Sequence, residues 1–133
     1  MMDIKNMNFG WATGYGDNKD LGNEIRIPVS GWFRCGEYDE GRATLEIRAL
    51  TNTDLECRVV LELADSPDDS SFTVKEIGSY FSAEGIHYPT TWTPIGTQTE
   101  TNQIARICVE FKRKTANGPE WARVSGRVEL KTC

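Results

Sequence analysis

The side chains with the clearest chemistry in this sequence are tryptophans and arginines that alternate with apolar residues. Between residues 121 and 130, apolar residues recur at every second position, and the intervening series includes Trp121, Arg123 and Arg127. Arginine pairs bidentately with carboxylates and tryptophan fills pockets, so both residue types are enriched in protein interfaces. The pattern therefore predicts a docking face.

Trp32 extends this prediction. It lies on the polar side of the alternating segment 24 to 35, and it joins Trp121 in one patch if the two strands share a sheet. A one-residue slip at Gly31 or Pro119 would instead return one of the rings to the core. The alternation alone leaves both alternatives open.

The glycine-rich segment 10 to 22, "GWATGYGDNKDLG", carries two more aromatic residues, Trp11 and Tyr15. It does not match the phosphate-binding loop pattern, so we predict a flexible aromatic loop. Trp11 either stacks on a sugar or a protein partner, which a rigid ring does at small entropy cost, or plugs one end of the fold.

Catalytic and metal-binding residues are not expected. His87 is the single histidine, and its segment "GIHYPTT" contains no nucleophile motif. The carboxylates of Asp65, Asp68 and Asp69 lack the regular ligand spacing of a calcium loop, and we predict a solvated turn there. The sequence therefore predicts a protein that is not an enzyme and has no cofactor.

Composition limits the partners. The chain of 133 residues is long enough for one hydrophobic core, so we expect a single domain over residues 1–133. Fifteen basic and twenty acidic residues give a net charge of -5, which repels phosphate backbones and argues against nucleic acid. The start of the chain lacks the apolar segment of a signal peptide, and no stretch is long enough to cross a membrane. We therefore expect cytoplasmic synthesis and no membrane partner.

The cysteines are expected to be free thiols. Cys57 alternates in phase with the apolar residues of its segment, whereas Cys108 is out of phase with those of its own. The two sulfur atoms would then lie on opposite faces of their sheets, too far apart for a disulfide. The same conclusion is extended to Cys35 and Cys133, because a reducing compartment keeps thiols free.

The segments that must position these residues are almost all strands. Residues 24 to 35 alternate, with Pro28 indicating an edge strand or a bulge. Segments 42 to 50 and 56 to 64 are predicted to form a hairpin, as are 101 to 113 and 121 to 131.

The middle of the chain is less regular. Segment 72 to 80 fits both strand and helix spacing, and residues 87 to 100 are predicted to form an irregular edge strand that Pro89 and Pro94 interrupt. The predicted fold is all-β: a single antiparallel β-sandwich, jelly-roll-like, with seven or eight strands and little helix.

The segments "VSGWFR", "ATLEIRAL", "TWTPIGTQTE", "IARICVEFKRK" and "ARVSGRVEL" follow one another in an order that resembles the jelly-roll carbohydrate-binding modules of the galactose-binding-like type. The resemblance spans about residues 25 to 130 and implies a jelly roll in which Trp92 packs rather than binds. Modules of this type often hold a structural calcium with an acidic residue of the last strand. Residues 124 to 127 here read Val-Ser-Gly-Arg, so the resemblance supplies no metal site.

Two functions from different classes follow. An acidic, all-β chain without a secretion signal is typical of a small structural subunit that docks on a large assembly such as a phage or virus particle, as a decoration or tail component. Its partners would be another protein or copies of itself, and its location the virion. The alternative is a carbohydrate-binding module that recognises a polysaccharide glycan, as the resemblance implies.

Overall fold

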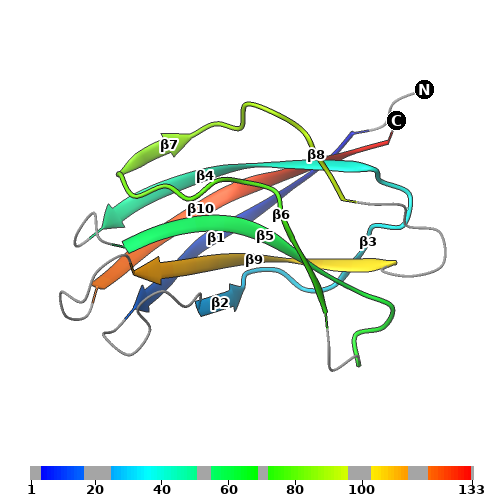
Figure 1. Cartoon of the computed structure of the whole chain (residues 1–133), viewed down its shortest axis with the longest axis horizontal. Helices are drawn as coiled ribbons and strands as arrows, with labels where there is room; N and C mark the ends of the chain where they lie inside the picture. Colours follow the sequence, from blue (N-terminus) through cyan, green and yellow to red (C-terminus); the bar gives the residue numbers. More distant parts are fainter. Residues whose placement is uncertain are drawn as a thin grey trace.

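The chain forms ten β-strands in a computed structural model that describes residues 4–16, 25–50, 55–68, 72–95, 103–113 and 120–132 (Figure 1). Only the backbone is described for residues 11–16, 49, 50, 113, 120 and 121. The strands are β1 (Ile4–Gly16), β2 (Ile25–Pro28), β3 (Phe33–Arg34), β4 (Glu40–Leu50), β5 (Leu55–Ala64), β6 (Thr73–Glu76), β7 (Gly85–His87), β8 (Thr93–Pro94), β9 (Ile104–Arg113) and β10 (Glu120–Lys131). The described residues contain no helix able to span a membrane.

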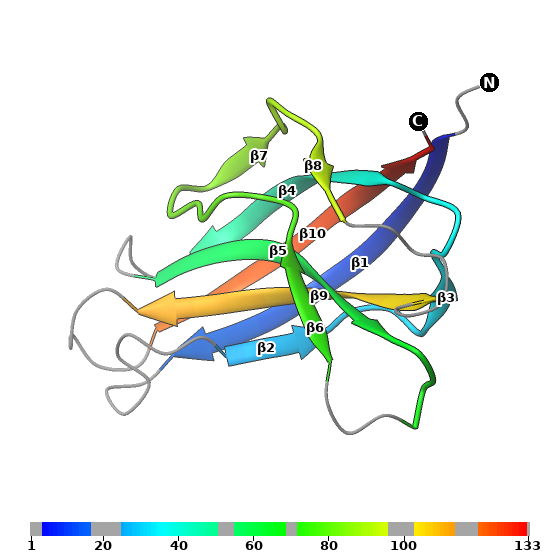
Figure 2. The ribbon, with the colours of Figure 1, turned by 45° about the vertical axis from the view of Figure 1, so that its right-hand side comes forward.

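The strands make two antiparallel five-stranded sheets that pack face to face (Figure 2). Sheet A has the order β1-β10-β4-β7, with β8 also pairing with β4, and sheet B has the order β2-β9-β5-β6, with β3 also pairing with β9. This jelly-roll-like sandwich confirms the predicted fold class. The strand count exceeds the prediction because β1 was not expected and two expected strands each divide into a pair of short ones.

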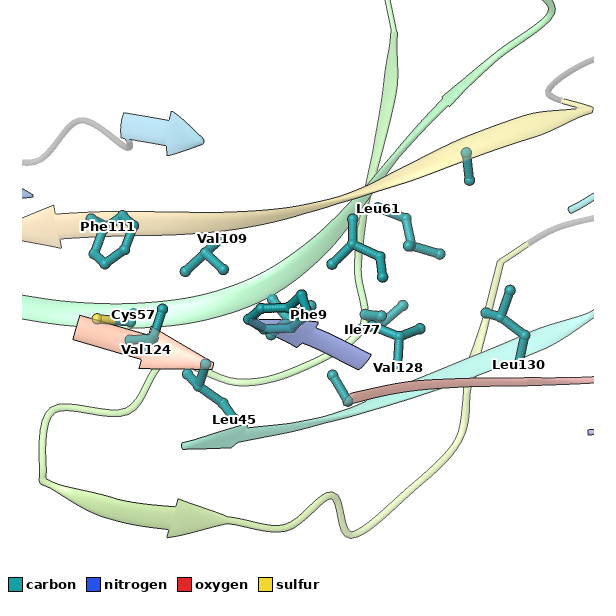
Figure 3. Packing of buried hydrophobic residues seen from close by; sticks show 14 of the residues in the cluster. Phe9, Leu45, Cys57, Leu61, Ile77, Val109, Phe111, Val124, Val128 and Leu130 are labelled. Carbon is teal, nitrogen blue, oxygen red and sulfur yellow. The ribbon is translucent and has the colours of Figure 1, made fainter. Parts of the chain in front are cut away.

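The alternation seen in the sequence places the core between the sheets. Ala43, Leu45 and Ile47 of β4 are buried, as are Val124 and Val128 of β10. Figure 3 shows the side chains of both sheets meeting in one cluster, including Phe9, Cys57, Leu61, Ile77, Val109, Phe111 and Leu130. Burial of this apolar surface, at roughly 25 cal/mol per Å², is the main source of stability.

One close fit in the core depends on a glycine. Phe9 of β1 lies opposite Gly126 of β10 in the ladder, and its ring covers the position that a side chain would occupy there. A Cβ atom at residue 126 would collide first with the backbone carbonyl oxygen of Thr44 on β4, and it would lie 2.8 Å from the Phe9 ring. The phenyl ring therefore fills the gap that a glycine leaves in a strand.

Both predicted hairpins are wrong. β4 lies in sheet A and β5 in sheet B, and β9 and β10 are likewise in different sheets. The alternation specifies which side of each strand faces the core. It does not specify the sheet, because the apolar side of a strand faces the core in either sheet. The short polar segments between these strands therefore fit a crossing as well as a hairpin turn.

The predicted loop over residues 10 to 22 is also wrong in its first part. Residues up to Gly16 belong to β1, which pairs with β10 along most of its length and shifts register between Phe9 and Ala12. Glycines lower strand propensity, yet ladder pairing with a neighbouring strand outweighs that local preference. Residues 17 to 22 lie outside the described residues.

The remaining expectations about elements are confirmed. Segment 72 to 80 contains the strand β6, so the helical alternative is wrong. Pro28 lies in β2, an edge strand of sheet B. The irregular segment before residue 95 supplies the short strands β7 and β8, which pair with β4 at the margin of sheet A.

The cysteine parity argument is confirmed for the described thiols. Cys57 belongs to the core cluster, whereas Cys108, although equally buried, lies on the outer side of sheet B. Cys35, Cys57 and Cys108 are free thiols. Burial raises the pKa of the Cys108 thiol to about 12, an effect that nearby Glu62 reinforces, so this thiol is unreactive at neutral pH. Cys133 lies outside the described residues.

Candidate functional site

The predicted docking residues do not all lie together. Arg123 and Arg127 are exposed on β10, on the outer face of sheet A. Trp32 lies between β2 and β3, on the outer side of sheet B, so it cannot join them in one patch. The prediction required both segments to share a sheet, and they do not.

The other three aromatic residues of the prediction lie in strands of sheet A. The ladder places Tyr15 of β1 directly opposite Trp121 of β10, and Trp11 falls at the register shift of β1. The side chains of Trp11, Tyr15 and Trp121 lie outside the described residues. Their binding role stays a prediction.

The outer face of sheet B carries a cluster of paired charges. Arg26, Glu110 and Arg58 form one row across β2, β9 and β5. The Arg58 Nε atom donates to a Glu110 oxygen at 2.7 Å, while Glu62 accepts from the Nε atoms of both Arg26 and Arg106. Both carboxylates are 3% exposed. Buried carboxylates of this kind are tolerated because every charge has hydrogen-bonded partners.

Aromatic rings cover this cluster. The Arg106 guanidinium lies 4.7 Å from the centre of the Trp32 ring and 5.2 Å from that of Phe72, and Arg58 lies 4.3 Å from the centre of Tyr80. Stacked cations of this kind are attracted by the ring faces. The chain's own aromatic side chains therefore cover part of the charge cluster on the outer face of sheet B, and Trp32 belongs to that cover.

Among the residues whose side chains the structure describes, the outer face of sheet A carries a smaller cluster. One ion pair lies near its β8 end, where Arg42 donates from Nε to Glu129 at 3.0 Å and from Nη2 at 3.3 Å. Trp92 packs on this pair, with its ring 4.2 Å from the Arg42 guanidinium and 4.5 Å from the Lys131 ammonium. Trp92 thus packs within the chain, as expected.

Next to this ion pair lies an open groove. It has a volume of about 410 Å³, and we call it the sheet A groove; it is lined by Asn8, Phe9, Thr44, Glu46, Ile86, Tyr88, Ser125, Gly126 and Arg127. Ile86 is 51% exposed and Tyr88 is 69% exposed. Among the described residues, neither Arg127 nor Glu46 has an ion-pair partner. The groove therefore combines exposed apolar side chains with unpaired charges of both signs.

A second cavity, also of about 410 Å³, lies at the margin of the sandwich, where β4 and the segments beside β6 and β7 meet. Its lining is rich in hydroxyl groups and includes Ser79, Phe81, Tyr88, Thr90, Thr91 and Thr93. Hydroxyl groups beside aromatic rings suit a neutral, hydroxylated ligand. Tyr88 borders both this cavity and the sheet A groove.

The His87 ring contacts residues that are close to it in the sequence. Its ring stacks on Phe81 at a centroid distance of 4.2 Å, and its Nε2 atom lies 2.6 Å from the carbonyl oxygen of Ala83. The carbonyl can only accept, so Nε2 carries the proton and donates it there. Among the described residues, no group of three histidine, cysteine or acidic side chains is placed to hold a metal.

The predicted solvated turn at residues 65 to 68 is present. Asp65 and Asp68 are exposed, and the Asp68 amide donates to the Ser66 hydroxyl at 3.2 Å. A hydroxyl that satisfies a nearby backbone amide is the local pattern expected of such a turn. Asp69 lies outside the described residues.

Ile86 and Tyr88 are exposed residues that the sequence pattern did not predict. Their positions flank His87, which faces inward beside Phe81, so the alternation Ile86, His87, Tyr88 was the available signal. The signal was weak because β7 spans three residues only. A strand this short carries too few alternations to be recognised by its period.

No protein-family model and no curated protein matches this sequence. Solved structures share the fold. The crystal structure of the infectious bursal disease virus VP2 subviral particle has a TM-score of 0.63 at 9% identity over 98% of this chain and 32% of that chain. The structure of the Gx strain of that virus has a TM-score of 0.64 at 8% identity over 99% of this chain and 33% of that chain. The structure of the Gt strain has a TM-score of 0.60 at 8% identity over 97% of this chain and 33% of that chain.

This chain therefore spans about a third of the length of the viral proteins it resembles in fold. Likeness at such low identity is evidence for the fold alone. It confirms the jelly-roll-like part of the sequence resemblance, and the solved structures are viral proteins rather than carbohydrate-binding modules.

Proposed function

We propose that this chain is a non-catalytic structural subunit that docks on other proteins, or on copies of itself, in a large assembly such as a virus or phage particle. The observation that carries the proposal is the contrast between the two outer faces. On sheet B the buried Glu62 and Glu110 are paired with arginines, and aromatic rings stack on two of these arginines, whereas on sheet A the exposed Ile86 and Tyr88 lie beside Arg127 and Glu46, which have no ion-pair partner among the described residues. Exposed apolar patches with a polar border are typical of docking surfaces.

The fold likeness supports the same function. Jelly-roll sandwiches recur in viral shells, and the VP2 subviral particle is one structure with this fold. A location in the virion, as a decoration or tail component, follows as part of the proposal. Arg123, Arg127 and Trp121 of β10 are the proposed anchors, because truncation of such residues at an interface typically costs about 2 kcal/mol or more.

The test is assembly of the purified chain. Sedimentation velocity and electron microscopy should show multi-copy particles for the unaltered chain, and Arg123→Ala and Trp121→Ala should disperse them without lowering the melting temperature. Arg34→Ala, an exposed arginine on β3 of the other sheet, is the matched control and should assemble normally.

A second candidate rests on the hydroxyl-lined cavity. Its threonines, together with Phe81 and Tyr88, favour a glycan ligand. If the unaltered chain remains a monomer in the assembly experiment and instead binds a polysaccharide on a glycan array, the structural-subunit proposal is wrong and this alternative replaces it. Unfolding of the Trp121→Ala monomer would show that its ring belongs to the core rather than to a docking surface.

A further inference from the structure

We propose that the sheet A groove pairs with the same groove of a second copy of this chain, across a two-fold axis. This inference rests on the proposed function and names the partner of its docking face. The groove presents two charges of opposite sign, Arg127 and Glu46, and neither has an ion-pair partner among the described residues. A surface that carries both members of an ion pair is complementary to itself.

The sheet register gives the geometry. Arg127 lies opposite Thr44, and Ser125 lies opposite Glu46, so the two charged residues are diagonal neighbours on the adjacent strands β10 and β4. They point to the same outer face, because residues two apart on a strand share a side. A two-fold axis that runs between them in the plane of the interface brings Arg127 of each copy opposite Glu46 of the other.

Apolar contact completes the pairing. Glu46 is followed across the sheet by Ile86 of β7, and Tyr88 lies two residues further along the chain. Both side chains are more than half exposed and border the groove. On contact with a second copy they lose water, while the two arginine-carboxylate pairs fix the register.

Charge favours a second copy over other partners. A purely acidic partner would place like charge against Glu46, and a purely basic one would place like charge against Arg127, each at a cost of several kcal/mol. A partner must therefore carry both signs in the reverse order along the same diagonal. The described surface of this chain itself has that arrangement.

The edge of sheet A is a less suitable meeting point. β1 is an edge strand, and long edges invite pairing with another chain. Here Lys5 shares the inward phase of Met7 and Phe9 and lies 5.7 Å from the Phe33 ring centre, and the strand shifts register after Phe9. An inward charge and a bulge both oppose strand addition.

Charge reversal tests the pairing. Arg127→Glu alone and Glu46→Arg alone each place like charges opposite one another twice in a homodimer, so each should weaken self-association by about 30-fold or more. A mixture of the two single variants should form a heterodimer, because both of its diagonal pairs are then attractive. The double variant should restore the homodimer for the same reason.

The measurements are sedimentation equilibrium for the dissociation constant and thermal melting for the fold. Arg34→Glu and Glu37→Arg make the same charge changes at exposed positions away from the groove and should pair as the unaltered chain does. Tyr88→Ser, which leaves the charges intact, should also weaken pairing.

Three results would overturn the inference. Single variants that associate as tightly as the unaltered chain would show that copies meet elsewhere, and the proposed function would stand if multi-copy particles still form. Failure of the mixture to form a heterodimer would show that Arg127 and Glu46 do not face each other. A chain that is monomeric in both sedimentation and electron microscopy would overturn the pairing, and with it the part of the proposed function that concerns copies of this chain.

Discussion

The carboxylate of Glu62 pairs with two arginines, Arg26 and Arg106. It is buried on the outer face of sheet B, where burial by itself would raise its pKa. Hydrogen bonds and charge from Arg106 and Arg26 outweigh this effect and hold the pKa of the Glu62 carboxyl below its ordinary value. Its ionised form is therefore stabilised by folding.

This pairing predicts acid sensitivity with a definite sign. Because the pKa is lower in the folded state, the contribution of Glu62 is complete above its unfolded pKa of about 4.3 and is lost as the pH falls through the lowered folded value. Glu62→Gln should therefore destabilise the chain at pH 7 by about 3 kcal/mol, since it removes the carboxylate that pairs with Arg106 and leaves Arg26 with only the longer contact to Glu110.

Denaturant melts of the unaltered chain and of Glu62→Gln, at pH 7 and between pH 4.5 and 2.5, measure the effect. The gap between the two unfolding free energies should narrow as the pH falls below about 4. Lys75→Gln, on β6 of the same sheet, is the control and should keep a constant gap. A gap for Glu62→Gln that is the same at every pH would contradict the assigned role of the carboxylate.

At the scale of the element, the contact of Phe9 with Gly126 makes β10 sensitive to a single methyl group. An alanine Cβ at residue 126 would lie 2.8 Å from the Phe9 ring and still closer to the backbone carbonyl oxygen of Thr44, and both approaches are closer than van der Waals contact allows. Gly126→Ala should destabilise the chain by about 1–3 kcal/mol, as overpacked cores do, measured by thermal melting.

Two further variants separate crowding from a general effect of replacing glycine. Gly31→Ala meets no atom within 4 Å and should leave the melting temperature nearly unchanged. Phe9→Leu combined with Gly126→Ala should recover only the part of the loss that comes from the Phe9 ring, because the contact of the methyl group with the Thr44 carbonyl oxygen remains. If Gly126→Ala melts like the unaltered chain, β10 moves freely enough to relieve the contact.

The connections from β4 to β5 and from β9 to β10, which pass from one sheet to the other, show what the sequence could and could not predict. Alternation in β9 and β10 correctly identified the inward residues, such as Ile107 and Val124, because burial on one face requires a period of two. It could not show that the two strands lie in different sheets, because the period of two is the same whichever strand is the hydrogen-bonding neighbour. The fold class was therefore predictable, and the strand order was not.

The same limit explains the candidate site. Arg127 was predicted as an exposed docking residue, and its exposure follows from phase within one strand. Trp32 was assigned to the same surface, but its place depends on which sheet contains β2 and β3. The row of Arg26, Glu110 and Arg58 likewise appears only when β2, β9 and β5 are placed side by side.

At the scale of the whole molecule, β10 occupies an unusual place in the order of the chain. It lies between β1 and β4 in sheet A, and it pairs with both along nearly its full length. Both views of the ribbon show it running through the middle of that sheet (Figures 1 and 2). Loss of β10 would therefore remove the centre of a sheet rather than an edge.

A chain that stops after Arg113 should consequently fail to fold. We expect it to show no cooperative thermal transition and to bind a hydrophobic dye such as ANS, because β1 and β4 lose their shared neighbour. Addition of a synthetic peptide spanning residues 120 to 132 should restore the cooperative transition. A truncated chain that melts cooperatively without the peptide would show that sheet A closes without its central strand.

Because β10 is the last strand in the chain, it also determines the order in which the two sheets can form during synthesis on the ribosome. The first strand of sheet A leaves the ribosome long before its partner is translated, since β1 begins at Ile4 and β10 ends at Lys131. At a translation rate of roughly 5–20 residues per second, the backbone groups of β1 and β4 that pair with β10 remain without this partner for several seconds. Sheet B has all its strands by Arg113 and can pair first. During this interval of synthesis, all strands of sheet B are present, whereas sheet A still lacks β10. Until β10 is made, chaperones or the inward Lys5 must keep the strands of sheet A from pairing with a neighbouring chain.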